Sequence, residues 1–407
     1  MSQAFGNIPI GALKNPETFR LRVPDEDLEE FKQLLKLSKI GPHTWYNQQE
    51  DRRFGVTRKW LQDAKDAWLN EFDWRKLEDR INSFPNFKAR VDSSHLGTLD
   101  VHFVALFSNK KDALPVIFMH GWPGSFLEFL PMLDLLVSKY SPDTLPYHIV
   151  VPSVPGYGFS ASSIPLDKET DVKEVAKAMH QLMLDLGFGS GYVAQGGDVG
   201  SFLASIMSVE FKECKAIHLN LIPPNPEDDN GGTDLLNSQE LEQLQRMEGF
   251  RKQGVSYALE HGLRPATIGL VLSASPLSLL AWIGEKYVEW VDSNHPLQLE
   301  MILELVSLYW FTGTFPRSVY PYRSMAQSFT TGEALPVQIS KEIPLGYSCF
   351  PKEITFMPKA WAERVYPNLK FYQAHEKGGH FAALEQPELF LQDVESFLKT
   401  VRTTTKI

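Results

Sequence analysis

The pattern of hydrophobic and polar positions changes near residue 99 of this chain. Before that point, "DEDLEEFKQLLKL" places Leu28, Phe31, Leu34 and Leu35 on one face of a helix, and "TRKWLQDAKDAWLNEF" repeats the same period. We therefore expect residues 1–95 to form a helical layer that packs its apolar faces against a larger body.

After residue 99, short apolar runs alternate with segments of helix length, a pattern typical of parallel strands joined by helices. Because the runs are apolar at nearly every position, they predict strands that are buried on both faces. The segment "DVKEVAKAMHQLMLDLGFG" predicts one of the helices, with Gly187 ending it. The predicted strands are "VHFVALF", "LPVIFMHG", "YHIVVPSVPG", "GYVAQGG" and "CKAIHLNLI".

The alternation is interrupted at "IPPNPEDDNGGTD", where turn-forming residues crowd together before a helical stretch rich in Tyr and Trp. It resumes at "IPLGYSCFP" and "NLKFYQAHEKGGH" and ends with an amphipathic helix around "PELFLQDVESFLKTV". We predict an α/β core over residues 96–222 and 341–407, interrupted by a helical cap over 223–340.

Composition and charge narrow the class of protein. The chain has 407 residues, 43% of them hydrophobic, and a net charge of −10 with scattered Lys and Arg, which argues against a nucleic-acid or anionic-membrane partner. The two cysteines cannot form a disulfide framework. Because neither a signal-peptide pattern nor an 18-residue apolar run is present, we expect a cytoplasmic protein without a membrane anchor.

The stretch "VAQGGDVGS" has the form of the G-x-S-x-G nucleophile elbow, with Asp198 in the place of the serine. Glycines on both sides tolerate a tight strand-to-helix turn, and the N-terminus of the following helix favours an ionised carboxylate. Asp next to Gly is also common in plain turns, so the interpretation of Asp198 as a nucleophile depends on its place between a strand and a helix.

The stretch "MHGWPGS" directly follows the strand "LPVIF". The backbone amides of Trp122 and Val199 could therefore point at one position and form an oxyanion hole. A packed turn with no chemical role is the alternative.

The stretch "HEKGGHF" is similar to a zinc motif, but H-E-x-x-H requires a histidine where this chain has Gly379. His375 and His380 are five positions apart and would not share a helical face, so we expect neither a metal nor another cofactor. His380, on a Gly-Gly loop after the strand "KFYQA", fits a general base in the chain order nucleophile, acid, histidine. A purely structural histidine is the alternative.

The acid that orients the histidine should follow a strand between the nucleophile and His380. Glu353 in "YSCFPKEI" meets that condition, although a solvated Glu beside Lys is its default interpretation. Asp228 and Asp229 are the competing candidates and rank second, because they lie in a proline-rich loop.

With these residues assembled, the chain resembles the microsomal-type and fungal epoxide hydrolases of the α/β-hydrolase fold over nearly its full length. The resemblance is carried by "HGWPGS", "VPGYGFS", "GGDVG", "YWFTGTFPRSVYPYR", "FPKE" and "EKGGHFAALEQP". It implies a mostly parallel sheet, an N-terminal meander that wraps the core and holds the cap, and a triad of Asp198, Glu353 and His380. It also leaves a homodimer open.

The resemblance further implies that two cap tyrosines protonate the epoxide oxygen. These are matched by Tyr257 and by Tyr322, with Tyr320 as the alternative to Tyr322. The expected reactants are a small apolar epoxide and water. An apolar pocket is suggested by a set of cap aromatics, namely Trp282, Tyr309, Trp310 and Phe311.

Three other functions remain as alternatives. A haloalkane dehalogenase would use the same aspartate, but usually has Trp after the nucleophile, where this chain has Val199. A non-catalytic binding protein on this fold predicts a broken triad. A dinucleotide-binding enzyme needs G-x-G-x-x-G in a single turn, whereas the glycines of "GFGSGYVAQGG" flank a strand.

Overall fold

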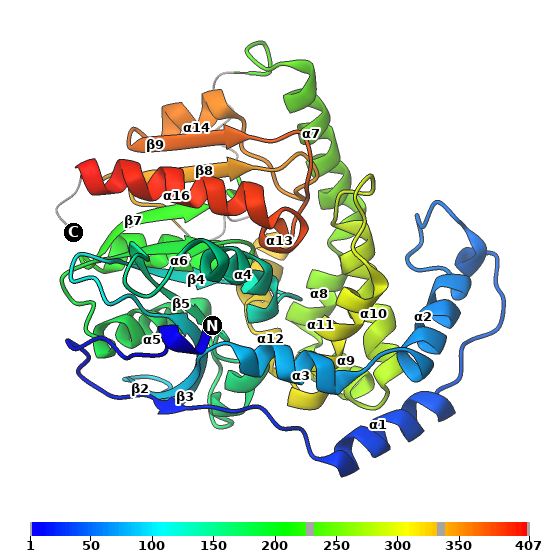
Figure 1. The fold of residues 1–407 in the computed structure, drawn as a ribbon. Coiled ribbons are helices and arrows are strands. Elements are labelled where there is room, and N and C mark those ends of the chain that lie inside the picture. The colour runs from blue at the N-terminus through cyan, green and yellow to red at the C-terminus, as the bar shows by residue number, and fades with distance from the viewer. Residues whose placement is uncertain (1, 225–231, 332–337, 405–407) are drawn as a thin grey trace.

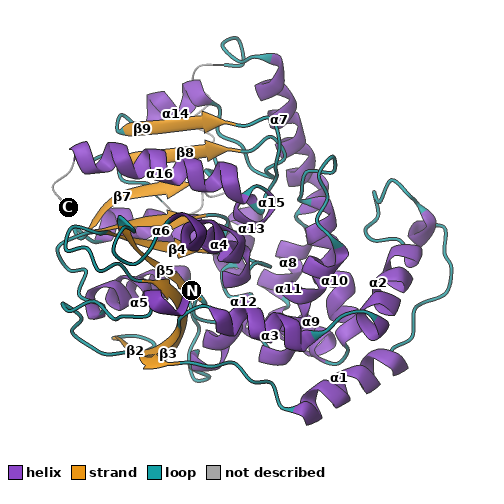
Figure 2. Ribbon diagram, in the orientation of Figure 1, coloured by secondary structure: helices purple, strands orange, loops and turns teal. Residues whose placement is uncertain are grey.

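One central sheet organises the molecule, and in residues 2–224, 232–331 and 338–404, which this computed structural model describes, it has nine strands (Figure 1, Figure 2). Their spatial order is β1-β2-β3-β5-β4-β6-β7-β8-β9. The pairs β1–β2, β2–β3 and β3–β5 are antiparallel. All the other neighbours, from β5–β4 to β8–β9, pair in parallel. The strands are β1 (Glu17–Thr18), β2 (Asn86–Ser93), β3 (Gly97–Leu106), β4 (Leu114–Met119), β5 (Tyr147–Pro152), β6 (Tyr192–Gly196), β7 (Cys214–Leu219), β8 (Leu345–Cys349) and β9 (Leu369–Ala374).

Helices cover both faces of this sheet. On one face α4 contacts α16, and on the other α5 contacts α6 (Figure 1). The predicted helix at "DVKEVAKAMHQLMLDLGFG" is α5, and Gly187 follows it with φ of +89°, as a C-terminal cap requires. The helices of the core are α4 (Leu130–Lys139), α5 (Val172–Asp185), α6 (Val199–Glu210), α14 (Lys359–Val365), α15 (Ala382–Glu385) and α16 (Pro387–Thr404).

The predicted fold class is confirmed, but three strands differ from the prediction. Strands β1 and β2 fall inside the segment predicted as a helical layer, and β3 pairs with both neighbours in antiparallel fashion. In β2 buried and exposed positions alternate over much of its length, which is the pattern of a strand with one wet face. The polar, Trp-rich composition around β2 hid that pattern.

The helices that precede β2 lie against the helices inserted between β7 and β8. They are α1 (Asp25–Leu37), α2 (Arg58–Asn70) and α3 (Trp74–Ser83). Helices α1 and α2 contact α10, and α2 and α3 contact α11. At this contact the indole of Trp68 is buried and donates a hydrogen bond to the Ser307 hydroxyl at 3.0 Å.

We use the name cap for the helices between β7 and β8. They are α7 (Ser238–Gly249), a π-helical turn (Phe250–Gly254), α8 (Ser256–Leu263), α9 (Pro265–Ser273), α10 (Pro276–Glu289), α11 (Leu299–Thr312), α12 (Phe315–Ser318) and α13 (Tyr322–Thr331). The limits predicted at residues 223 and 340 stay predictions, because 225–231 and 332–337 lie outside the described residues. No helix in the described ranges is by itself long and apolar enough to cross a membrane, although α9 and α10, bent by 118°, together match a span in length and composition.

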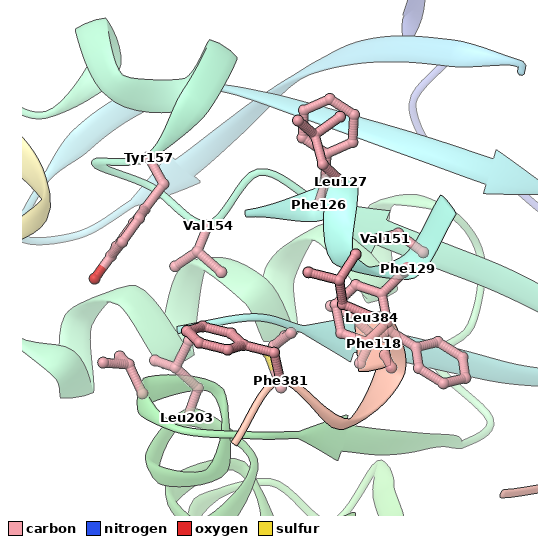
Figure 3. Close-up of a cluster of buried hydrophobic side chains, with 14 of the residues drawn as sticks. Phe118, Phe126, Leu127, Phe129, Val151, Val154, Tyr157, Leu203, Phe381 and Leu384 are labelled. Atoms are coloured by element: carbon pink, nitrogen blue, oxygen red, sulfur yellow. The ribbon is translucent and has the colours of Figure 1, made fainter. Parts of the chain in front are cut away.

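The hydrophobic core continues from the sheet up to the carboxyl ends of its central strands. Figure 3 shows Phe118 of β4 with Phe129, Phe381 and Leu384, which belong to segments far apart in the sequence. All four side chains are buried. The loops that follow β4, β6, β8 and β9 are therefore held on a packed base, and the candidate site is built from these loops.

Candidate active site

Asp198 lies at the turn between β6 and α6. Its backbone has φ of +49° and ψ of −126°, a conformation that is unfavourable for any residue with a Cβ atom. At Gly200 a Cβ atom would come within 1.9 Å of the Met119 carbonyl oxygen, so only glycine lets α6 approach β4 this closely. The sequence thus forms a strained elbow that lifts the Asp198 carboxylate above the sheet.

His380 lies between the two carboxylates predicted for the triad. Its Nδ1 is 2.6 Å from Oε1 of Glu353, and its Nε2 is 3.5 Å from Oδ2 of Asp198. Glu353 follows β8 and His380 follows the neighbouring parallel strand β9, so both side chains start from the same edge of the sheet. The predicted alternative of a solvated glutamate does not apply, since Glu353 is buried.

Opposing effects act on the protonation of His380. Burial lowers its pKa, but the negative charges of Glu353 and Asp198 together outweigh burial and hold the pKa well above the usual value. The imidazole is therefore protonated while both carboxylates are ionised. Loss of either charge would lower its pKa again.

The backbone of Trp122 fixes the other oxygen of Asp198. Its N–H donates a hydrogen bond to Oδ1 at 2.7 Å. Val199, the predicted second amide, is the first residue of α6, where N–H groups have no partner within the helix. The two oxygens of the Asp198 carboxylate thus have different surroundings: Oδ1 accepts a hydrogen bond from the Trp122 amide, and Oδ2 lies beside His380.

Two cap tyrosines gather over the indole of Trp122. The ring of Tyr257, from α8, stacks on it at a centroid distance of 5.3 Å and an interplanar angle of 13°. Tyr322, at the start of α13, packs edge-on against both rings. Burial is the largest effect that raises the pKa of both phenols above the usual value, and the charge of Asp198 adds to it, so both are protonated donors.

Tyr320 is positioned differently from Tyr322. Its hydroxyl donates a hydrogen bond to the carbonyl oxygen of Pro155 at 3.1 Å, in the loop after β5. Of the two candidates for the second donor, the geometry favours Tyr322. Asp228 and Asp229, the competing acids, lie outside the described residues.

Comparison with known proteins shows which family the chain is similar to. Models described as "Epoxide hydrolase N terminus" and "alpha/beta hydrolase fold" match residues 16–129 and 115–299. A solved structure of an Aspergillus niger epoxide hydrolase is 46% identical, with a TM-score of 0.88 and coverage of 98% of this chain and 99% of that one. A Dothistroma septosporum protein, provisionally named an epoxide hydrolase, is 41% identical over 97% of this chain and 93% of its own. Epoxide hydrolase 1 of Sus scrofa is 30% identical over 93% of this chain and 88% of its own.

The chain belongs to the epoxide hydrolase family. This confirms the resemblance drawn from the sequence motifs, and with it the class of enzyme, a hydrolase. Among the residues that the structure describes, no cluster of three or more His, Cys, Asp or Glu side chains is placed to hold a metal ion. His375, the other histidine of "HEKGGHF", lies 2.6 Å from Asp393 of α16.

The aromatic residues predicted to bind substrate in this epoxide hydrolase have other partners. Trp282 donates its indole N–H to Nε2 of His261 at 2.9 Å, and Tyr309 donates its hydroxyl to the Gly124 carbonyl at 3.1 Å. Trp310 and Phe311 pack near Phe31 of α1. None of the four lines the cavity beside Asp198. A role in substrate binding stays a prediction for Trp282, Tyr309 and Trp310.

Sequence reasoning missed two polar residues at this site, Glu128 and Asn220. Both line a cavity together with Asp198 and His380. Glu128 completes a capping box with Ser125, and the S-x-x-E spacing directly after "HGWPG" was a usable signal for it. Asn220, just past the end of β7, has no comparable motif.

Proposed function

We propose that the protein hydrolyses epoxides to vicinal diols through an ester with Asp198. The observation that carries the proposal is the arrangement of the Asp198 carboxylate, with Oδ1 on the Trp122 amide at 2.7 Å and Oδ2 3.5 Å from His380. A carboxylate so held can attack an sp³ carbon without a general base. The names of the relatives agree with this substrate class.

In the first step Oδ2 of Asp198 attacks an epoxide carbon from the side opposite the breaking C–O bond. The ring oxygen leaves as an alkoxide, and Tyr257 and Tyr322 stabilise and protonate it. The product of this step is a hydroxyalkyl ester of Asp198. Since the ester is neutral, one of the two charges that raise the pKa of His380 is lost. The imidazolium then releases its proton, which balances the proton that the tyrosines gave to the alkoxide, so that His380 is neutral and both phenols are protonated again.

In the second step neutral His380, oriented by Glu353, takes a proton from a water molecule that attacks Cγ of Asp198. The resulting oxyanion on Oδ1 is stabilised by the amides of Trp122 and Val199. When the Cγ–Oδ2 bond breaks, His380 returns the proton to the leaving oxygen and the diol departs. One diol oxygen comes from the epoxide and the other from Asp198, which regains an oxygen from water.

The test is product analysis by mass spectrometry with styrene oxide, an aliphatic terminal epoxide and a bromoalkane. We expect diols from the wild type and none from Asp198→Asn, after intact-mass verification that the asparagine has not deamidated. In a single turnover in ¹⁸O-labelled water the label should enter Asp198 and not the diol. Release of bromide with both epoxides untouched would instead identify a haloalkane dehalogenase.

Two further predictions accompany this proposal. The natural substrate is expected to be a small apolar epoxide, because the tyrosine pair lies among aromatic rings. The intracellular location and the homodimer drawn from the sequence stay predictions, which fractionation and light scattering would test.

A further inference from the structure

A small cavity lies beside the Asp198 carboxylate, and its volume is about 20 Å³. This is enough for one water molecule but not for an epoxide substrate. Part of its wall is apolar, from Phe129, Phe381 and Phe390, of which the first two are seen in Figure 3.

Six side chains with polar atoms line the cavity: those of Asp198, His380, Glu128, Asn220, Trp122 and His120. Both ring nitrogens of His120 already have backbone partners, the Gly121 carbonyl oxygen at 3.1 Å and the Val154 N–H at 3.2 Å, so the argument concerns the first four. Asn220 is held by a hydrogen bond to its Oδ1 from Nε2 of Gln195 at 2.9 Å, and this oxygen retains a second lone pair. A buried water molecule typically needs two to four polar partners, and this cavity offers that number.

Glu128 is the unusual member of this set, because it is a buried carboxyl group without a cationic partner of its own. Its Oε1 accepts the Ser125 N–H at 3.1 Å. A Cβ atom at Gly124 would come within 1.7 Å of Oε1, so glycine there is required for Glu128 to turn inward.

Burial raises the pKa of Glu128 to about 8; His380 and the Ser125 amide lower it, and the charges of Asp198 and Glu385 raise it further. At neutral pH the group is therefore a neutral acid with one O–H to donate. The titratable groups that interact with it electrostatically include Asp198 and His380 from loops of the core, Glu385 from α15, and Tyr287 and Tyr309 from the cap.

We propose that this cavity binds the water molecule that hydrolyses the Asp198 ester, and that Glu128 and Asn220 are the residues that position it. The inference rests on the proposed function, because it concerns the second step of that reaction. The water donates one hydrogen to Nε2 of His380 and the other to Oδ1 of Asn220. The Glu128 O–H donates to one of its lone pairs, which leaves the second lone pair directed at Cγ of Asp198.

This assignment separates the two half-reactions. Attack by Asp198 on the epoxide does not use the water, so it should be indifferent to Glu128. Hydrolysis of the ester should need both positioning residues. A residue that served only as a helix cap would instead affect the stability of the fold and both steps together.

The experiment uses full-length wild type, Glu128→Met, which is apolar and of similar size, and Glu128→Gln, which keeps a neutral hydrogen-bond donor. Glu240→Met is the matched control, because Glu240 completes the same kind of capping box with Asn237 in α7, away from the cavity. Each protein is mixed rapidly with styrene oxide and quenched in acid. The ester is followed by intact mass and the diol by chromatography.

In Glu128→Met we expect ester formation at the wild-type rate and ester hydrolysis slowed by about 10-fold to 100-fold, so that the ester accumulates. Glu128→Gln and Glu240→Met should hydrolyse the ester within a few-fold of wild type. If Glu128→Met does not fold, Asn220→Ala takes its place and should show the same separation of rates.

Equal slowing of both steps, unchanged hydrolysis in Glu128→Met, or failure of Glu128→Gln to restore it would overturn the assignment. Failure of the proposed function gives a different result, because the wild type itself would then form neither ester nor diol.

Discussion

Nδ1 of His380 lies 2.6 Å from Oε1 of Glu353, and both side chains are almost entirely buried. The same Glu353 oxygen accepts the N–H of Ile354 at 2.6 Å, while Oε2 is buried without a hydrogen-bond partner among the described residues. Among the proposed catalytic residues, Glu353 thus contacts His380. The contact fixes the orientation of the imidazole, so that Nε2 points toward Asp198 and is the nitrogen available for proton transfer.

Replacing Glu353 by Gln should therefore slow the second step more than the first. The charge that stabilises the imidazolium is lost, whereas the attack by Asp198 does not require it. We expect hydrolysis of the ester to fall by about 10²-fold to 10⁴-fold, measured by rapid quench and intact mass. Glu388→Gln, an exposed change on α16, is the control. A Glu353→Gln protein that hydrolyses its ester at the wild-type rate would remove Glu353 from the triad.

The protonation of His380 should depend on the charge of Asp198. In Asp198→Asn one of the two carboxylates that raise its pKa is gone, so the pKa of His380 should fall relative to wild type. Histidine-selective NMR titration measures this shift, with Asp63→Asn on the surface of α2 as the control. An unchanged pKa would contradict the proposal that ester formation converts His380 into a base.

The same coupling has a consequence for stability. A histidine whose pKa is raised in the folded state contributes stability that is complete below its unfolded value, about 6.5, and is lost as pH rises through the folded value. Wild type should therefore lose more free energy of unfolding than Asp198→Asn when the pH is raised from 6.5. Parallel pH profiles for the two proteins would contradict this.

The sequence carried most of the fold because parallel strands are buried on both faces, as the runs at β4 and β5 are. Asp198 could be found because its glycine spacing is a local signal. The S-x-x-E spacing could indicate that Glu128 caps a helix, but not that it lies beside Asp198 and His380, which reach it from distant segments. Nothing in the sequence around Trp282 indicates its hydrogen bond to His261, which helix packing brings about, and its role in substrate binding stays a prediction. Local patterns predict elements and turns, whereas the direction of a buried polar or aromatic side chain is decided by tertiary contacts.

Tyr322, at the start of α13, can be compared with Tyr320, which lies two residues before it. Tyr322→Phe and Tyr257→Phe should each lower the rate of ester formation by about 10²-fold or more, because each removes a proton donor. Tyr320→Phe should leave that rate within a few-fold and cost only about 1 kcal/mol of stability, since it loses one hydrogen bond to Pro155. Rapid-quench kinetics and urea unfolding measure the two quantities. The reverse order for Tyr320 and Tyr322 would reassign the second donor.

Gly200 should tolerate no side chain, for the steric reason that shapes the elbow. A Cβ atom there lies 1.9 Å from a backbone oxygen, so Gly200→Ala should destabilise the protein by about 3 kcal/mol or more. Gly249, at the end of α7, has no atom within 4 Å of its Cβ position and has helical backbone angles, so Gly249→Ala should stabilise by about 0.5–1 kcal/mol. Urea unfolding of both variants tests the contrast, and a neutral Gly200→Ala would contradict the close approach of α6 to β4.

Glu128 should give the protein a distinctive dependence of stability on pH. Its pKa is about 8 in the folded state against 4.5 as the usual value, because of burial and the neighbouring charges. Between these values the unfolded chain releases the proton and the folded protein keeps it, so the free energy of unfolding falls as pH rises, by about 1 kcal/mol per pH unit. Below 4.5 and above 8 this contribution is constant.

Glu128→Gln lacks the ionisable group, so its stability relative to wild type should increase from pH 5 to pH 8 and then level off. Urea unfolding at pH 5, 6.5, 8 and 9 measures the difference, with Glu240→Gln as the control. A difference that stays constant over this range would mean that Glu128 is ionised in the folded protein, and it could then not donate a hydrogen bond to the water beside Asp198.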